Sequence, residues 1–347
     1  MEKFSQFRDR GSGIAPFLPA ARPPASKYCP LPVRAFLFAF RLPFLIFVSV
    51  GYFLVLQWLP IGALGKKAAL WCILGIPSIW WVDLQVDGVR KGSLSRQQSR
   101  LPGSGSIIAA SFTSPIDALY LGAIFDPIFT ASYPTTKEVE EISLLSAILR
   151  AFSAPQLYPP RGSKTTSLAA LASKYPGRPI VAFSECTTTN GRGILPLSPS
   201  LVDISADAKI FPISLRYQPE DLVTPLPGSY LSFLWSLLSK PTHYIRVRIA
   251  EPVANGGRQP SVSEKMKTST YQTNFFDILD EVSASKSKGG ASSSSEEAEV
   301  DLNPAEKNLL DTVGESLARL GRGKRVGLEV GDKMDFVKEW QRMKRIW

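Results

Sequence analysis

Histidine is almost absent from this sequence, which holds a single copy, His243, among its 347 residues. Cysteine occurs three times, at Cys29, Cys72 and Cys186, and no two of them have the close spacing of metal ligands. A Cys/His zinc site is therefore not predicted, because such sites use four ligands from these residue types. An odd number of scattered cysteines also gives no disulfide framework, which is typical of a reducing, cytosol-facing compartment.

The charge is strongly one-sided. The chain carries 40 Lys and Arg against 30 Asp and Glu, a formal net charge of +10. This excess predicts an anionic partner, and nucleic acid and a phospholipid surface are the two main classes. The basic residues of the chain are not interleaved with aromatic residues, as they are in grooves that bind single-stranded nucleic acid. There is also no zinc-finger or clear helix-turn-helix signature. We therefore expect no nucleic acid and favour a phospholipid membrane surface.

One long apolar run supports that preference. Residues 42–64 contain no charged side chain, and at about 1.5 Å per residue a helix of this length reaches about 34 Å, enough for a bilayer core. Lys66 and Lys67 separate it from a second, shorter apolar run at 68–81. Basic residues flank both runs, which favours a hairpin that dips into the membrane from the cytosolic side. A buried core helix of a soluble protein is the alternative, whereas the polar, Pro-rich first 30 residues are unlike a signal peptide.

The middle of the chain alternates short β-like runs with helical ones. Strands are predicted at 107–110, 179–183, 210–215 and 244–249. Helices are predicted at 115–124, 138–152 and 164–174. This alternation is typical of an α/β domain with functional loops at the strand ends.

The expected organisation has five parts. They are a polar N-terminal segment (1–34), a membrane-inserting hairpin (35–82), a globular domain (83–255), a linker (256–302) and C-terminal helices (303–347). Residues 283–298 of the linker are low in complexity and are predicted to be disordered. The apolar stretch at 228–238 is a membrane-contacting helix, a cover for an apolar channel, or a core helix.

Two polar motifs follow predicted strands. In the first, Ser111-Phe-Thr-Ser-Pro-Ile-Asp117, Ser114 can cap a helix that begins at Pro115 and carries Asp117 in its first turn. By itself this spacing fits a purely structural role for Asp117 at the helix terminus.

The second motif, Phe183-Ser-Glu-Cys-Thr-Thr-Thr-Asn-Gly-Arg192, places Glu185 where a buried strand meets a loop rich in Thr, Asn and Gly. Hydroxyls and backbone N–H groups in such a loop suit a phosphate, although a loop of this composition is more often only a turn.

Together, and in this order, the two motifs resemble the first and third motifs of the glycerolipid (lysophospholipid) acyltransferases, which read His-x-x-x-x-Asp and centre on a Glu. The basic segment around Arg161 and the run Ile210-Phe-Pro-Ile213 are similar to the other two blocks of the family. The resemblance covers about residues 100–215. Within the family it is greatest to the fungal lysophosphatidic acid acyltransferases of lipid droplets and the endoplasmic reticulum.

The resemblance implies a mixed sheet flanked by helices, with an N-terminal membrane hairpin and C-terminal helices. It further implies acyl transfer from acyl-CoA, as co-substrate, to the free hydroxyl of a lysophospholipid, with no metal or other cofactor. Lysophosphatidate is the expected acceptor, since Arg161 and Arg192 suit a small dianionic phosphate; another lysophospholipid headgroup is the alternative. The expected location is the endoplasmic reticulum membrane or the lipid droplet, with the catalytic domain in the cytosol.

By position in the motifs, Asp117 and Glu185 are the implied catalytic residues. The implied substrate- and phosphate-binding residues are Thr113, Ser114, Arg161, Thr187, Thr188 and Arg192. The third motif departs from the family's Glu-Gly-Thr-Arg, because Cys186 replaces the Gly and Thr188 replaces the Arg.

The first motif departs more seriously, because Phe112 stands where the family has its proton-accepting His. Three hypotheses are open. Asp117 takes the proton, directly or through water, or the substrate phosphate does so. Cys186 and His243 form a nucleophilic pair. Or catalysis has been lost, and the protein is a membrane-bound lipid-binding scaffold.

Overall fold

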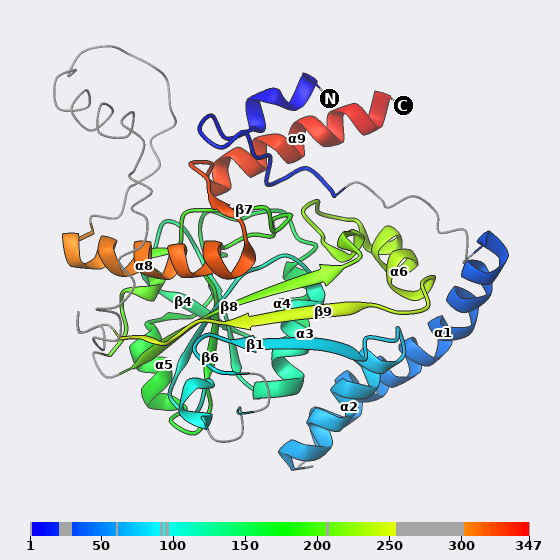
Figure 1. Ribbon diagram of the computed structural model, residues 1–347, viewed down its shortest axis with the longest axis horizontal. Helices are drawn as coiled ribbons and strands as arrows, with labels where there is room; N and C mark the ends of the chain where they lie inside the picture. The colour runs from blue at the N-terminus through cyan, green and yellow to red at the C-terminus, as the bar shows by residue number, and fades with distance from the viewer. Residues whose placement is uncertain are drawn as a thin grey trace.

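A nine-stranded mixed sheet forms the centre of the computed structural model (Figure 1). The model describes residues 2–20, 30–59, 62–90, 93, 97–205, 208–254 and 302–346. Cys29, most of the expected linker and its low-complexity tract at 283–298 lie outside these residues.

The strands follow the order β1-β9-β8-β2-β6-β3-β4-β5, and β10 adds to β8. The strands of the sheet are β1 (Trp81–Val86), β2 (Ile107–Ala110), β3 (Ile128–Ser132), β4 (Val139–Ile142), β5 (Thr165–Thr166), β6 (Ile180–Phe183), β8 (Lys209–Gln218), β9 (Tyr244–Ile249) and β10 (Val253–Ala254). At the centre β2 is parallel to both β6 and β8, whereas β9 and β4 run antiparallel to their inner neighbours. The predicted mixed α/β fold is confirmed, as are all four predicted strands.

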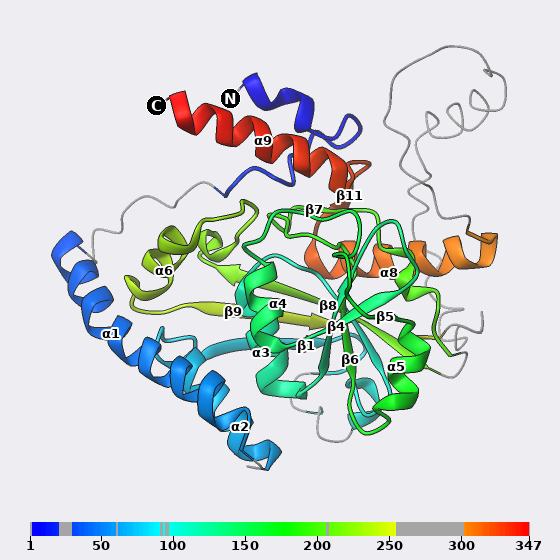
Figure 2. The ribbon, with the colours of Figure 1, turned by 180° about the vertical axis from the view of Figure 1, so that it is seen from behind.

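Helices cover both faces of the sheet (Figures 1 and 2). They are α1 (Leu31–Gly51), α2 (Ala63–Gly75), α3 (Pro115–Phe125), α4 (Leu144–Arg150), α5 (Leu168–Lys174), α6 (Tyr230–Leu238), α8 (Pro304–Gly321) and α9 (Val330–Ile346). The predicted helix at 138–152 is wrong in its first part, because 139–142 form β4. The predicted helix at 164–174 is also wrong at its start, because 165–166 form β5 and α5 begins at Leu168. Both short strands pair antiparallel at the edge of the sheet, and local helix propensity does not reveal such pairing.

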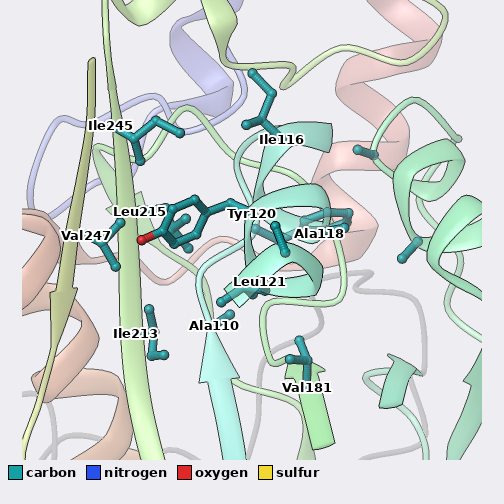
Figure 3. Close-up of a cluster of buried hydrophobic side chains, with 14 of the residues drawn as sticks. Ala110, Ile116, Ala118, Tyr120, Leu121, Val181, Ile213, Leu215, Ile245 and Val247 are labelled. Carbon is teal, nitrogen blue, oxygen red and sulfur yellow. The ribbon is translucent and has the colours of Figure 1, made fainter. Parts of the chain in front are cut away.

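Two apolar layers hold this arrangement together. On one face, α2, α3 and α4 pack on the sheet; Figure 3 shows Tyr120 and Leu121 of α3 against β-strand residues such as Leu215 and Val247. On the other face, α5 and α8 cover side chains such as Ile107 and Ile180. The short apolar runs of the central strands β2 and β6 are thus buried on both sides, as expected for parallel strands.

A third cluster joins segments that are far apart in the sequence. Phe4 and Phe7 of the short helix η1 (Glu2–Phe7), together with Phe17, pack around Phe336 of α9. Below them a small parallel sheet pairs β7 (Gly193–Ile194) with β11 (Lys324–Arg325). Figure 1 shows η1 and α9 side by side above β7, so both segments lie over the loop that follows β6.

The apolar N-terminal helix has two different faces. Leu31–Leu56, comprising α1 and a π-helical turn (Tyr52–Leu56), is long and apolar enough to cross a membrane. Leu45, Val48, Tyr52 and Leu56 pack on the apolar core, whereas the opposite stripe is exposed. That stripe consists of Phe36, Phe40, Phe44, Phe47, Leu54 and Trp58.

Candidate active site

The two sequence motifs meet at one edge of the sheet. Because β2, β6 and β8 are parallel, their carboxyl ends lie together, which is where open α/β sheets bind ligands. Backbone hydrogen bonds fix the loops to one another: Thr189 N–H donates to Phe112 O at 3.0 Å, and Thr224 N–H donates to Thr113 O at 2.9 Å. The loop after β2 is therefore held between the loops that follow β6 and β8.

Asp117 is fully buried at the start of α3. Ser114 is the N-cap and Pro115 the first helical residue, so the predicted capping box is present. Asp117 Oδ2 accepts hydrogen bonds from Thr113 N (2.7 Å), Ser114 N (2.8 Å) and Thr113 Oγ1 (3.2 Å). Asp117 Oδ1 accepts one from the hydroxyl of Tyr217, near the end of β8. Burial raises the pKa of Asp117 to about 6, although these donors act in the opposite direction.

Phe112 belongs to the apolar core. It is 1% exposed, and its ring stacks on Phe183 with centroids 4.3 Å apart and planes at 27°. Phe112 continues the alternation of Ile108 and Ala110 along the chain, and all three side chains belong to the same apolar layer. The position that carries the family's histidine is thus filled by a packed aromatic ring.

Glu185 lies at the end of β6 and is also fully buried. Its Oε2 accepts from Leu195 N and Thr189 Oγ1, both at 3.4 Å, while Oε1 has no hydrogen-bond partner. Burial raises the pKa of Glu185 to about 8, and the nearby charge of Asp117 adds to the effect. The group is therefore mainly a neutral acid at pH 7.

The turn after Glu185 has an unusual backbone. Cys186 has a φ of 58°, in the left-handed region that glycine adopts without a steric penalty. This conformation gives a physical reason for the Gly at this position of the family's motif. Burial raises the pKa of the Cys186 thiol to about 12, so a thiolate is strongly disfavoured.

A buried lysine from α9 holds the same loop. Lys333 is fully buried, and its Nζ donates to Thr187 Oγ1 (2.8 Å), Thr188 O (2.6 Å) and Thr188 Oγ1 (3.0 Å). Three acceptors match the three N–H donors of an ammonium group. Burial lowers the pKa of Lys333 to about 7, and Glu185 acts in the opposite direction only when it is ionised.

A cavity of about 290 Å³ opens beside these loops. Its polar lining comes mainly from the loops after β2 and β6 and from β8 and β9, with Thr113, Asn190, Gly191, Arg216, Tyr217 and Arg246 among the lining residues. Its apolar lining includes Trp81 and Tyr244, which stack on each other at the exposed β1–β9 edge. The cavity thus joins a polar end, whose charged residues are Arg216, Arg246, Asp83 and Glu220, to an aromatic one.

The predicted binding residues take different positions. Thr113 lines the cavity, and Ser114 Oγ donates to Leu222 O at 2.8 Å. Thr187 and Thr188 hold Lys333. Arg192 is exposed and pairs with Glu220, a cavity residue, at 2.9 Å. Arg161 is exposed in the loop before β5 and is not part of the cavity lining.

The structure separates Cys186 from His243. His243 is buried beneath α6, where its Nε2 lies 2.7 Å from Leu237 O, and burial lowers its pKa to about 4. No hydrogen bond joins it to Cys186 in the part of the chain that the structure describes. A neutral thiol without an adjacent base is not an activated nucleophile, so the geometry gives no support to a thioester intermediate.

Sequence reasoning missed four residues of this site. Tyr217 continues the alternation of Phe211, Ile213 and Leu215 beyond the predicted strand end, so a longer strand would have included it. Arg216 and Arg246 stand on strands as isolated basic residues, and Lys333 is 146 positions from Thr187. None of these three gives a local signal.

Metal-binding chemistry has no candidate among the described residues, where no group of three or more His, Cys, Asp or Glu could hold an ion.

Comparison with known proteins supports the resemblance read from the motifs. A protein of Schizosaccharomyces pombe, named "Putative lysophosphatidic acid:oleoyl-CoA acyltransferase", is 29% identical over 260 residues, covering 73% of this chain and 85% of its own length. Lysophosphatidic acid:oleoyl-CoA acyltransferase 1 of Saccharomyces cerevisiae is 26% identical over 274 residues, covering 73% and 84%. No protein-family model and no solved structure matches the chain.

Proposed function

We propose that this chain, a relative of fungal lysophosphatidic acid:oleoyl-CoA acyltransferases, transfers an acyl group from acyl-CoA to the free hydroxyl of lysophosphatidic acid. The products are phosphatidic acid and CoA. The observation that carries the proposal is the position of Asp117, buried close to a cavity that Arg216 and Arg246 help to line, where three parallel strands end.

The reaction needs a proton acceptor. The substrate hydroxyl oxygen attacks the thioester carbonyl, the C–O bond forms, the C–S bond breaks, and the hydroxyl proton must leave. A general base contributes about 10²- to 10⁴-fold to such a step. Asp117, whose pKa is raised to about 6, is ionised at pH 7 and still basic enough to take the proton. The proton then returns to the departing CoA thiolate.

The phosphate of the acceptor has a matching charge in the cavity. Arg216 and Arg246 both line it; Arg246 is paired with the carboxylate of Asp83 at 3.2 Å, and Arg216 donates to Gly191 O at 3.3 Å. Guanidinium groups suit phosphate because they donate two parallel hydrogen bonds. Arg161 and Arg192 are exposed, and we assign them to an outer contact with phosphate or with CoA.

The apolar end of the cavity suits a lipid substrate. The membrane-facing hairpin leads directly into β1, and Trp80 packs against Gly75 at the end of α2. Trp80, Trp81 and Tyr244 are exposed aromatic residues beside the cavity, a pattern typical of membrane–water interfaces. Acyl chains can therefore remain in the lipid phase while the headgroup enters the site.

We further propose that α1 lies along the membrane surface rather than across the bilayer. One stripe of α1 packs on the core and the opposite stripe is exposed, as in interfacial helices. Arg41, near the middle of α1, donates to Lys240 O (2.6 Å) and Ser78 Oγ (2.8 Å), which fixes the helix to the domain. The endoplasmic reticulum membrane and the lipid-droplet monolayer both accommodate this arrangement, with the catalytic domain in the cytosol.

The activity is tested with purified full-length protein in phospholipid vesicles. Release of free CoA from oleoyl-CoA is measured with lysophosphatidate, lysophosphatidylcholine or lysophosphatidylethanolamine as acceptor. We expect the highest rate with lysophosphatidate, and a loss of about 10²-fold or more in Asp117→Asn. The exposed Asp203→Asn is the matched control and retains full activity. No CoA release with any acceptor would overturn the proposal.

One observation favours a second function. Phe112 packs in the core and supplies no base, so the site fits a lipid-binding scaffold as well. Binding of lysophosphatidate to vesicle-bound protein without any CoA release would support that function instead.

The orientation of α1 has its own test. Trp58→Cys, in a chain whose other cysteines are replaced by alanine, is labelled with an impermeant thiol reagent supplied either inside or outside sealed vesicles. An interfacial helix predicts no labelling from the side opposite the catalytic domain. Labelling from that side would show a spanning helix.

A further inference from the structure

We propose that Tyr217 is a catalytic residue: its hydroxyl accepts the proton of the substrate hydroxyl while passing its own proton to Asp117. The inference rests on the proposed acyltransfer and names the group that replaces the missing histidine at the substrate. It follows from the geometry of Asp117, which lies out of reach of the cavity.

Asp117 has no exposed surface and does not line the cavity. Its Oδ2 already accepts three hydrogen bonds, two of them from backbone N–H groups that the start of α3 requires. Its Oδ1 is the remaining oxygen, and it accepts a hydrogen bond from the Tyr217 hydroxyl. A proton from the substrate therefore has to arrive through another group.

Tyr217 connects Asp117 to the cavity. It lines the cavity, and the alternation of β8 turns its side chain to the same face as Leu215, toward α3. Burial and the adjacent carboxylate raise the pKa of Tyr217 well above its usual value, so the phenol keeps its proton before the reaction begins. A protonated phenol that donates to a carboxylate still has lone pairs to accept a hydrogen bond from the substrate.

The step balances without any added reactant. As the substrate oxygen bonds to the thioester carbon, its proton moves to Tyr217 Oη, and the Tyr217 proton moves to Asp117 Oδ1. When the C–S bond breaks, the proton on Asp117 returns through Tyr217 to the CoA sulfur. Tyrosine and aspartate are thereby restored, and no tyrosinate has to exist as a separate species.

Thr113 is the rival route, because it lines the cavity and its Oγ1 lies 3.2 Å from Asp117 Oδ2. Oδ2 is occupied by two backbone donors, which disfavours its protonation. A phenol is also a far stronger acid than an aliphatic hydroxyl, so it transfers its proton more readily. Both considerations favour Tyr217.

Ionisable groups from several elements lie near Asp117. The charge of Asp117 contributes to the raised pKa of Glu185, after β6, and an ionised Glu185 favours the protonated form of Lys333 of α9. Tyr120 of α3 lies near Tyr217. With Asp117 as the acceptor, kcat/KM of the wild-type protein should fall as the pH drops below about 6.

The experiment compares Tyr217→Phe with Tyr120→Phe in the CoA-release assay. Both tyrosines are 3% exposed and belong to the same apolar cluster, but the Tyr120 hydroxyl makes no hydrogen bond to a carboxylate within the described residues (Figure 3). We expect Tyr217→Phe to lower kcat/KM by about 10²-fold or more, and Tyr120→Phe to stay within about threefold of wild type. The fall of kcat/KM at low pH that is expected of the wild-type protein should disappear in Tyr217→Phe.

The double variant Tyr217→Phe/Asp117→Asn separates a relay from two independent effects. Groups that act as one unit are not additive, so the double variant should be about as active as the weaker single variant. A Tyr217→Phe protein that keeps its activity and its acidic limb would overturn the relay while leaving the acyltransferase function intact. Activity lost in Thr113→Val but kept in Tyr217→Phe would assign the route to Thr113. A wild-type protein without CoA release would instead refute the proposed function itself.

Discussion

Phe112→His restores the residue of the family motif, and we expect it to destabilise the protein without raising its activity. The imidazole would enter an apolar stack beside Phe183, and Phe112 does not line the cavity. The carboxylate that a family histidine would contact is already bound to Thr113, Ser114 and Tyr217. A base at position 112 would thus reach neither the substrate nor a free carboxylate oxygen.

The cost can be estimated from three effects. The substitution gives up part of the roughly 1.5 to 3 kcal/mol from burying a phenyl ring. It weakens an aromatic pair worth about 0.5 to 1.5 kcal/mol. It also buries an imidazole N–H without a partner, at about 1 to 3 kcal/mol. Since the first two overlap, a loss of about 2 to 4 kcal/mol in the free energy of unfolding is expected.

Thermal unfolding followed by tryptophan fluorescence measures this loss, and CoA release measures activity. Phe112→Leu is the control, because it keeps an apolar side chain and gives up mainly the stacking, about 1 kcal/mol. An increase in kcat/KM in Phe112→His, with a new pH dependence near that of imidazole, would refute the reasoning. It would mean that the His–Asp geometry of the family motif is accessible in this fold.

Three further predictions follow from the site. Lys333→Met should lower kcat/KM at least about tenfold by freeing the Thr187–Thr188 loop. Lys338→Met, on the exposed side of the same helix, should leave kcat/KM unchanged. Equal effects of the two substitutions in the CoA-release assay would contradict this prediction. Cys186→Gly should keep full activity and raise the melting temperature slightly, because glycine relieves the left-handed backbone; loss of activity with an intact fold would restore a chemical role for the thiol. The raised pKa of Glu185 means that, between about pH 4.5 and 8, the folded protein holds a proton that the unfolded chain has lost. The free energy of unfolding should therefore fall as the pH rises through this range, by at most about 1.4 kcal/mol per pH unit from this group. Glu185→Gln should flatten this pH dependence, and an unchanged slope in thermal unfolding at pH 5 to 8 would count against the prediction.

Local patterns predicted much of the fold. The central strands are short apolar runs whose burial on both faces is visible in composition, and the start of α3 is a capping box confined to four residues. β1 was not predicted, because its Trp-rich beginning continues the apolar run of the hairpin. β4, with the sequence Val-Glu-Glu-Ile, has helix-forming residues and becomes a strand only by pairing with β3.

The same difference between local patterns and long-range contacts applies to the candidate site. The placement of Asp117 depends on contacts within four positions, so its motif could be read. Tyr217 reaches Asp117 from 100 positions away, and Lys333 reaches Thr188 from 145. Such contacts depend on strand order and helix packing, and no spacing rule in a single sequence specifies them.

The contact between Lys333 and the loop after Glu185 bears on the order in which the protein becomes functional during synthesis. The apolar helix α1 is made early and can associate with lipid while translation continues, whereas α9 is made after every strand of the central sheet. A nascent chain therefore contains Asp117, Tyr217 and Glu185 before the lysine that holds the loop exists. On the proposed function, acyl transfer would then begin only after α9 has docked.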